Sequence, residues 1–416
     1  MPLQHTGFSH VDNADRNKRV ILNIIREKGP LTRREISDTC HLSITTSKRL
    51  VDEALRDGYV KESTREAQPG KRGRRATGIS LDAEYAHSIG VVVQPGMIAF
   101  SVVDLSGRVV DERTVAIGNE PADRLIERIC RELRSQRGGA HVRARGRLIG
   151  VGVGVAGVID AREGTVFYCP SLPGWENIPL AARLQQRLEA DILVDDAVRC
   201  IALAEKRYGV AVGLNTFLYI YIGRGVGAGI VLDNRFYRGN GGLAGEFGHI
   251  TVKEQGPLCN CGNRGCLEAL VSQDAILRSI NEMIASGVYS VLNQSASRIL
   301  ALQDIEEAAA AGDKLAIMVV HKVAESIGTG VADLVNIFDP GVVILGGEVI
   351  SHLGDHLIEG IKNTVSLRGI HSITQRTRIL IGGLKGLVAA RGAATLMLEK
   401  FFGNEILSLG FEGRSL

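Results

Sequence analysis

A histidine and three cysteines near the middle of the chain constrain its folding more than any other feature. The stretch HITVKEQGPLCNCGNRGCLE, residues 249–268, contains three of the seven cysteines of the chain within eight positions, ten residues after a histidine. One imidazole and three thiolates form the ligand set of a closed tetrahedral Zn2+ site, whereas a chance cluster of buried thiols is the alternative. We therefore expect one structural zinc ion per chain, held by His249, Cys259, Cys261 and Cys266.

Carboxylates stand on both sides of this predicted zinc loop. A site with four protein ligands has no position for an activated water, so the metal is expected to fold the loop and not to catalyse a reaction. The folded loop would hold Glu246 on one side and Glu268 on the other, where both carboxylates can accept hydrogen bonds from the hydroxyls of a sugar. A third acidic site, Asp195 and Asp196, follows a predicted strand.

The length of the chain, 416 residues, indicates two or three compact domains. The N-terminus lacks the basic, apolar and small-residue order of a signal peptide, and no apolar run reaches membrane-spanning length. These features predict a cytoplasmic protein without a membrane partner. Because the cytoplasm is reducing, clustered cysteines are expected to be metal ligands or redox groups and not disulfides.

The first 80 residues predict a small, basic helical domain. They carry 16 Lys and Arg against 10 Asp and Glu, whereas the whole chain has a net charge of only +3. Residues 14–28 place apolar side chains at helical spacing, and residues 31–40 form a second helix that starts with a capping box of Thr32 and Glu35. A third helix at 44–58 follows a short link, in the order of a helix-turn-helix.

A short strand candidate, YVKES, and the basic segment QPGKRGRRATGISL follow the third helix. Together they predict a wing beside a recognition helix. The start of that helix would enter the major groove of DNA, and the basic hairpin would contact phosphates or the minor groove. The alternative is a small protein-interaction module with a flexible basic linker. The predicted DNA contacts are Thr45, Thr46, Lys48, Arg49, Lys71, Arg72, Arg74 and Arg75.

From about residue 86 the sequence changes to short apolar strands, glycine turns and amphipathic helices, which is an α/β pattern. The pattern recurs in the second half of the chain, so two similar lobes around a ligand-binding cleft are expected. The glycines of IGRGVGAGIV, residues 222–231, fit either a phosphate-cradling turn or a purely structural hairpin.

The chain resembles the ROK family (repressor, open reading frame, kinase) in five segments: LPGWENIPL, VDDAVRCIALAEKRYG, GRGVGAGIVLDNRFYRGNGGLAGEFGHI, CNCGNRGCLEAL and VVILGGEVI. This family contains sugar kinases and winged-helix, sugar-responsive repressors. The resemblance covers nearly the whole chain, and it implies two actin-like, hexokinase-like lobes with a sugar bound in the cleft between them. The implied sugar contacts are Asn177, Asp195, Asp196, Glu246, His249 and Glu268.

Two positions depart from the family's kinases. Those kinases open the first lobe with an Asp-x-Gly-Gly-Thr turn that binds phosphate, whereas this chain has no carboxylate, paired glycines or threonine between Val92 and Gly96. Pro95 has no N–H to donate to a phosphate, so no kinase activity is expected, although Asp196 matches the general base of those kinases. Asp195 stands where the family more often has asparagine, which exchanges an amide donor for an acceptor.

The sequence thus predicts a sugar-responsive DNA-binding regulator, a repressor of carbohydrate uptake or catabolism genes whose operator affinity changes when a sugar or sugar phosphate binds. The alternatives are an ATP-dependent sugar kinase that carries a DNA-binding domain, and a regulator that answers to a protein partner. Paired recognition helices predict a homodimer or homotetramer. The expected domains are a winged helix-turn-helix at 1–82, a first lobe at 83–208 to which a helix at 391–402 returns, and a second lobe at 209–390 with the zinc loop.

Overall fold

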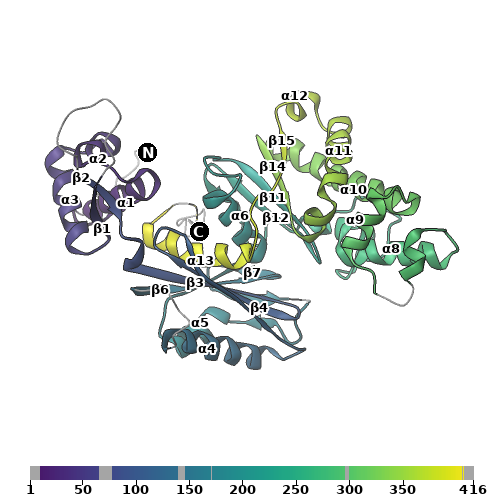
Figure 1. Ribbon diagram of the computed structural model, residues 1–416, viewed down its shortest axis with the longest axis horizontal. Helices are drawn as coiled ribbons and strands as arrows, with labels where there is room; N and C mark the ends of the chain where they lie inside the picture. Colours follow the sequence, from purple (N-terminus) through teal and green to yellow (C-terminus); the bar gives the residue numbers. More distant parts are fainter. Residues whose placement is uncertain are drawn as a thin grey trace, which may run out of the picture. The chain divides into compact units, whose positions relative to one another are not determined.

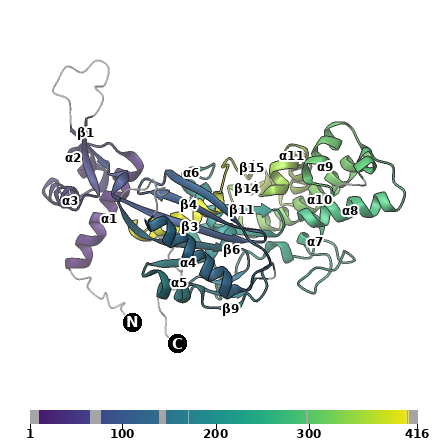
Figure 2. The ribbon, with the colours of Figure 1, turned by 60° about the horizontal axis from the view of Figure 1, so that its bottom comes forward.

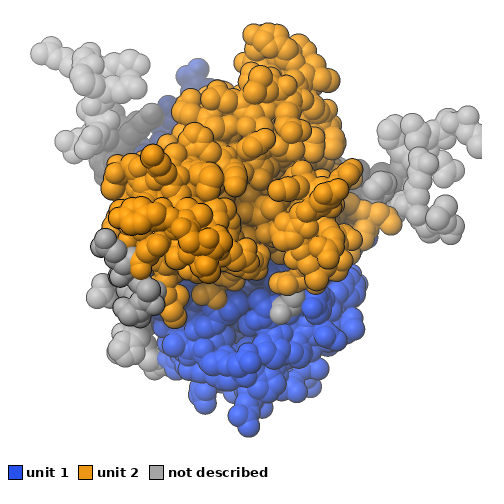
Figure 3. Space-filling view, turned by 90° about the vertical axis from the view of Figure 1, so that its right-hand side faces the viewer, with its two compact units in different colours: residues 1–200, 389–407 blue, residues 201–388, 408–416 orange. Residues whose placement is uncertain are grey.

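The structure is a computed structural model of the chain, and it describes residues 10–64, 77–138, 146–169, 171–295, 299–404 and 406. The chain divides into two compact units, one of residues 1–200 and 389–407 and one of residues 201–388 and 408–416 (Figure 3). The first unit therefore contains the N-terminal helices, a first sheet and the C-terminal helix.

The first unit begins with a winged helix-turn-helix. It consists of helices α1 His10–Lys28, α2 Arg33–Cys40 and α3 Ile44–Arg56, followed by the antiparallel strands β1 Val60–Thr64 and β2 Thr77–Leu81 (Figure 2). The predicted capping box of Thr32 and Glu35 is present at the start of α2, and Ser43 caps α3. These caps satisfy backbone N–H groups that lack a helical partner, which fixes where both helices begin.

A five-stranded sheet forms the centre of the first unit. Its strands are β3 Ala86–Gln94, β4 Met97–Asp104, β5 Val109–Ala116, β6 Arg147–Val155 and β10 Ile192–Asp196, after a short 3-10 turn η1 Ala83–Tyr85. The spatial order is β10-β6-β3-β4-β5. Strands β3 to β5 form an antiparallel meander, and β6 and β10 extend the sheet in parallel with β3.

Helices cover both faces of this sheet (Figure 1). One face packs against α4 Ala122–Gly138 and α5 Leu180–Leu188. The other face receives α13 Val388–Phe402, whose backbone comes so close that a Cβ atom on Gly90 would lie 1.8 Å from the Ala390 carbonyl oxygen. A Cβ atom on Gly152 would lie equally close to the Ala393 oxygen. Glycines in β3 and β6 therefore allow α13 to lie directly on the sheet.

A small antiparallel sheet, β7 Val158–Asp160, β8 Thr165–Tyr168 and β9 Glu176–Ile178, completes the first unit. Trp175 lies just before β9 and is fully buried in the same core as α4 and α5. Its ring therefore anchors this loop and is not available to stack on a ligand.

The second unit repeats the arrangement of the first. Helix α6 Ala197–Tyr208 leads into strands β11 Phe217–Ile222, β12 Val226–Leu232, β13 Arg235–Phe236, β14 Val342–Gly346 and β15 Arg378–Ile381. Their order is β13-β12-β11-β14-β15, again an antiparallel meander extended by two parallel strands. The predicted α/β fold with two similar lobes is confirmed by this repetition.

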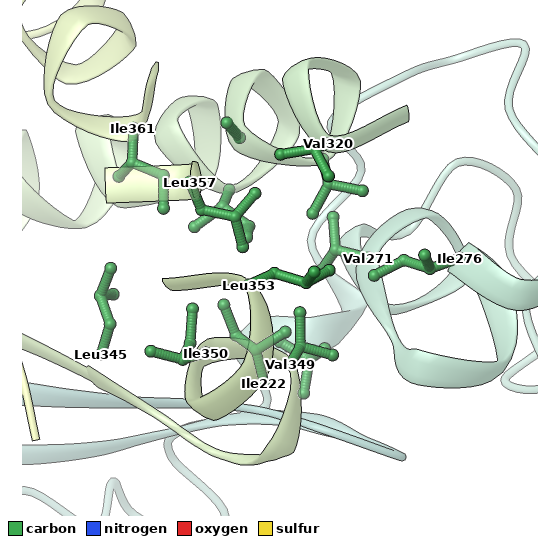
Figure 4. Close-up of a cluster of buried hydrophobic side chains, with 14 of the residues drawn as sticks. Ile222, Val271, Ile276, Val320, Leu345, Val349, Ile350, Leu353, Leu357 and Ile361 are labelled. Carbon is green, nitrogen blue, oxygen red and sulfur yellow. The ribbon is translucent and has the colours of Figure 1, made fainter. Parts of the chain in front are cut away.

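Helices pack on the second sheet around a large apolar core (Figure 4). They are the 3-10 turns η2 Phe247–His249 and η3 Val291–Ser295, with α7 Leu267–Val271, α8 Gln273–Ala285, α9 Leu302–Ala310, α10 Lys314–Phe338, α11 Glu348–Arg368 and α12 His371–Thr374. Helix α10 is long and apolar enough to cross a membrane by length and composition alone, but most of its apolar stretch is buried. It is the central helix of this core.

Candidate functional site

Four side chains of the second unit converge in the geometry of a metal site. The ligand atoms of His249, Cys259, Cys261 and Cys266 all lie within 4.8 Å of one another. The Cys259 sulfur is 3.7 Å from His249 Nδ1, and the Cys261 and Cys266 sulfurs are 3.6 Å apart. A tetrahedral site with Zn–S bonds of about 2.3 Å has an edge of about 3.8 Å. The four side chains therefore fit a tetrahedral metal ion.

The backbone around these ligands is a compact double turn. Isolated β-bridges join Thr251 to Cys266 and Leu258 to Arg264. Gly265 has φ +69°, and a Cβ atom there would lie 1.6 Å from the Lys253 carbonyl oxygen. Only glycine tolerates this approach, so the loop places its thiols through a backbone path that side chains would block.

The three thiols differ in their electrostatic surroundings. Burial, together with hydrogen bonds to Cys261 and Cys259, raises the pKa of the Cys266 thiol to about 12. Burial also raises the pKa of Cys259, whereas a hydrogen bond from the Asn263 backbone lowers the pKa of Cys261. A bound cation would favour the thiolate form of all three.

His249 faces two partners with its two ring nitrogens. While Nδ1 faces Cys259, Nε2 lies 3.9 Å from the Glu246 carboxylate. A metal-bound imidazole commonly presents its other nitrogen to a carboxylate or a water. The structure thus brings together two of the predicted sugar contacts, Glu246 and His249, beside the metal cluster.

Glu268 connects the metal loop to the glycine-rich hairpin of β11 and β12. It lies two residues after Cys266, and its Oε2 accepts a hydrogen bond from the Val226 N–H at 3.0 Å. Its other oxygen accepts no hydrogen bond within the described residues, so it remains available to a ligand hydroxyl. The Gly223 N–H is also used internally, since it donates to the Gly225 carbonyl.

A second carboxylate covers the same hairpin. Glu348, at the start of α11, accepts a hydrogen bond from the Tyr221 hydroxyl at 2.5 Å, and a Cβ atom on Gly223 would lie 2.0 Å from its Oε2. Burial first, and the Glu348 charge second, raise the pKa of Tyr221. Two carboxylates and internally bonded N–H groups favour the structural interpretation of these glycines over a phosphate cradle.

Asp195 and Asp196, at the end of β10, lie in two different environments. Asp195 is nearly fully buried, and its Oδ1 accepts hydrogen bonds from Arg199 Nε at 2.6 Å and from the Asp196 N–H at 2.8 Å. Asp196 is half-buried, and its Oδ1 accepts from the N–H groups of Val198 and Arg199 at the start of α6. Oδ2 of Asp196 accepts no hydrogen bond from any described residue, so it can receive a ligand hydroxyl.

Burial raises the pKa of Asp196, and the positive charge of Arg199 partly offsets this rise. Burial acts to lower the pKa of Arg199, but the charges of Asp195 and Asp196 and the hydrogen bond to Asp195 outweigh it and hold that pKa above its ordinary value. Arg199 was not among the predicted site residues, although its position four residues after Asp195 has the spacing of an ion pair on one helix face.

Asn177 is exposed in β9 and has φ +51°, in the left-handed region that asparagine tolerates better than most residues. It belongs to the first unit with Asp195 and Asp196, whereas Glu246, His249 and Glu268 belong to the second. Their common contact with a sugar stays a prediction.

The winged helix presents one exposed helix face. Along α3, Ser47, Leu50, Val51 and Ala54 are buried, while the predicted DNA contacts Thr45, Lys48 and Arg49 are exposed and Thr46 is half-buried. Thr45 and Lys48 make no side-chain hydrogen bond or ion pair within the described residues, whereas Arg49 pairs with Glu53 at 2.5 Å. The other predicted contacts, Lys71, Arg72, Arg74 and Arg75, lie outside the described residues.

The winged helix shares one hydrophobic core with α13. Ile21 and Ile25 of α1 pack in the same cluster as Leu398 and Phe402 of α13. Asn23 donates to the Phe402 carbonyl oxygen at 3.0 Å. The winged helix is thus packed against the C-terminal helix of the α/β domain.

A buried ion pair crosses this interface. Arg26 Nη1 lies 3.0 Å from Glu399 Oε1, with side-chain exposures of 7% and 0%. The Arg26 guanidinium also lies over the Phe402 ring, 4.5 Å from its centroid, and Asn404 donates to the second Glu399 oxygen at 2.6 Å. Nothing in the sequence around either residue predicts an ion pair between side chains 373 positions apart.

Comparisons with known proteins agree with this architecture. The ROK family matches residues 89–400, and a winged helix-turn-helix DNA-binding family matches residues 15–61. The xylose repressor of Caldicellulosiruptor bescii is 30% identical over 393 residues, 92% of this chain and 95% of the relative. The DNA-binding transcriptional dual regulator NagC of Escherichia coli K12 is 28% identical over 347 residues, 82% of this chain and 84% of NagC.

Two solved structures are similar to this chain. A ROK family transcriptional regulator, described as a homologue of the E. coli MLC protein, superposes with a TM-score of 0.83 at 25% identity, covering 96% of this chain and 98% of its own. A ROK family glucokinase from Streptomyces griseus, solved with glucose and AMPPNP, gives 0.64 at 30% identity over 74% of this chain and 98% of its own. The chain therefore belongs to the ROK family, and it carries a winged helix-turn-helix DNA-binding domain before the family domain.

Proposed function

We propose that this chain is a cytoplasmic transcriptional repressor that binds operator DNA and changes its operator affinity when a sugar or sugar phosphate binds the family domain. The observation that carries the proposal is the exposed face of α3, on which Thr45 and Lys48 have no side-chain partner among the described residues, on a winged helix joined to a ROK domain. The named relatives, a xylose repressor and NagC, are DNA-binding regulators that match more than four fifths of the chain.

DNA binding is tested by separating base contacts from phosphate contacts. We expect Arg74→Ala, in the predicted wing, to weaken binding to all sequences and to lower the salt dependence by about one phosphate contact. We expect Thr45→Ala, on the exposed face of α3, to weaken operator binding by about 1–3 kcal/mol and to leave nonspecific binding unchanged. Gel shifts at two salt concentrations measure both effects, and equal losses on all sequences for both variants would contradict this placement of α3.

We propose that the effector is held through hydroxyl groups. The carboxylates of Asp196 and Glu268 each keep one oxygen without a partner among the described residues, and such oxygens accept hydroxyl hydrogen bonds. Glu246, His249 and Asn177 complete the proposed contacts. The buried Asp195 has little free surface, so its predicted contact with the sugar is the weakest of the set.

Asp196 supplies a pH test of this effector site. Ionised Asp196 offers its free Oδ2 as an acceptor, and protonation removes one acceptor position, so effector affinity should fall as pH drops through the raised pKa of Asp196. Arg199→Met removes a positive charge that lowers that pKa, so the fall should move to higher pH.

We expect Asp196→Asn to weaken effector binding about ten-fold or more, and the exposed Asp191→Asn to leave it unchanged. Calorimetric titration across pH measures both, and an unchanged affinity in Asp196→Asn would remove Asp196 from the site.

We propose that the metal held by His249 and the three cysteines is one structural Zn2+ per chain. The ligand set and the spacing of the ligand atoms support zinc, and four protein ligands leave no position for a reactive water. Bound zinc would fix the loop that carries Glu246 and Glu268. The proposed assembly is a homodimer or homotetramer, because paired recognition helices read paired half-sites.

A kinase carrying a DNA-binding domain is the second candidate, and the family's glucokinases together with Asp196 favour it. Three features argue against it: the Pro95–Gly96 turn between β3 and β4 offers no carboxylate, and Glu268 and Glu348 place negative charge beside the glycine hairpin. We therefore expect no sugar-dependent release of ADP from ATP. Sugar-dependent release that disappears in Asp196→Ala would establish the kinase instead.

A further inference from the structure

We propose that Ile44, the first residue of α3, reads the 5-methyl group of a thymine in the major groove. Each operator half-site would then hold an A·T pair beneath the start of α3. The inference rests on the proposed DNA-binding function and adds to it the identity of one base pair.

Ile44 is unusually exposed for its size and chemistry. Its relative exposure is 72%, whereas Val20, Phe167 and Tyr168, the other exposed large apolar residues in the described part of the first unit, lie between 39% and 49%. Single exposed apolar side chains are ordinary on protein surfaces, so exposure alone carries no conclusion. The position of Ile44 at the start of α3 is what suggests a contact with DNA.

Ile44 occupies the part of α3 that a recognition helix directs at base edges. Ser43 caps the helix through the Thr46 N–H, so Ile44 is the first residue of its first turn. Helix-turn-helix proteins contact bases with the N-terminal residues of the second helix of the motif. Ser47 and Val51, one and two turns further along α3, are buried, whereas Ile44 stays exposed at the end of the helix.

The polar neighbours of Ile44 limit what this end of the helix can read. Arg49, one turn further along the helix, is held by Glu53. Thr45 and Lys48 remain for hydrogen bonds to bases or phosphates. Ile44 has no polar side-chain atom, and the apolar group that unmodified B-DNA presents in the major groove is the thymine methyl. An isoleucine at this position therefore selects thymine through a methyl contact.

Uracil provides the chemical test, because it differs from thymine only by that methyl group. Duplexes that bind the full chain are first selected from a random pool, and each thymine is then replaced by uracil in turn. We expect one position in each half-site where uracil lowers the affinity of the wild type about four-fold, the value of one buried methyl group. We expect Ile44→Ala to bind the thymine and uracil duplexes equally, because it has lost the partner of the methyl.

Val20→Ala is the matched control, since it also shortens an exposed β-branched side chain but lies on α1. It should keep the four-fold discrimination, and the exposed position of Ile44 should leave the melting temperature of Ile44→Ala unchanged. Wild-type indifference to uracil at every position, or full discrimination by Ile44→Ala, would overturn the inference. Equal binding to all sequences in the selection would overturn the proposed function and this inference with it.

Discussion

Cys266→Ser will abolish metal binding and unfold the loop of residues 249–268. Cys266 is fully buried, and its sulfur lies 3.6 Å from Cys261 within the four-ligand cluster. Structural zinc in small peptides contributes about 10–16 kcal/mol of apparent binding energy, so even a fraction of this value is large against the stability of one domain. We expect wild-type protein to contain one zinc ion per chain and the variant none, with a lower melting temperature for the variant.

Cys40→Ser is the control for this experiment, because Cys40 is a half-buried cysteine of the winged helix outside the cluster. It should retain the metal. The loss of Cys266 should also weaken effector binding, since Glu268 follows it by two residues and depends on the same loop. Full zinc content in Cys266→Ser, or an unchanged melting temperature after chelation of the wild type, would contradict the structural role of the metal.

Arg26→Ala will destabilise the first unit by about 3–5 kcal/mol. The change breaks the buried ion pair of Arg26 with Glu399, and removing one partner of a buried ion pair is strongly unfavourable. It also removes the guanidinium from the face of Phe402. Trp175 is the only tryptophan of the chain and is buried in the first unit, so its fluorescence during urea unfolding reports on this unit.

Lys400→Ala supplies the comparison on the same helix. Lys400 pairs with Asp191 at 3.0 Å, and both side chains are about half exposed, so its removal should change stability by at most about 1 kcal/mol. Replacing both buried partners, as Arg26→Met with Glu399→Leu, should recover most of the lost stability. A decrease of less than about 1 kcal/mol in the free energy of unfolding of Arg26→Ala would mean that this pair does not fix the winged helix to α13.

The interface between α1 and α13 joins the winged helix to the central sheet of the first unit. Helix α13 lies on the central sheet through Gly90 and Gly152, and its last turn packs against the winged helix. A shift of α13 on that sheet would therefore be transmitted to the DNA-binding domain through packed side chains. Coupling through such contacts acts equally in both directions, so DNA should change effector affinity as much as effector changes DNA affinity.

The features that could be predicted from the sequence are those with short-range causes. The capping box of Thr32 and Glu35 marks the start of α2 because its hydrogen bonds span three residues. The cluster of His249 and three cysteines could also be predicted, since the three cysteines lie within eight positions, and the structure brings the four side chains together in an arrangement that could hold a metal ion. The repeated sequence pattern of short strands and glycine turns predicted two similar lobes, and the matching strand orders of the two sheets confirm them.

The features that the sequence did not reveal depend on long-range packing. The periodicity of α1 placed Val20, Ile21, Ile24 and Ile25 in one apolar stripe, yet Val20 is 40% exposed. Nothing near Arg26 indicates that Glu399 will neutralise it. The glycine hairpin stayed ambiguous because its N–H groups are taken by Glu268 and by the turn itself, which only the fold shows.

The most direct test of this account is a gel shift of the full chain on the DNA upstream of its own gene, repeated with a panel of sugars and sugar phosphates at fixed salt. Salt must stay fixed because phosphate contacts dominate the affinity. We expect a specific shift that one compound weakens, and we expect Asp196→Asn to keep the shift but lose the response. A shift that no sugar alters and that Asp196→Asn leaves unchanged would contradict the claim that effector and operator binding are coupled in this chain.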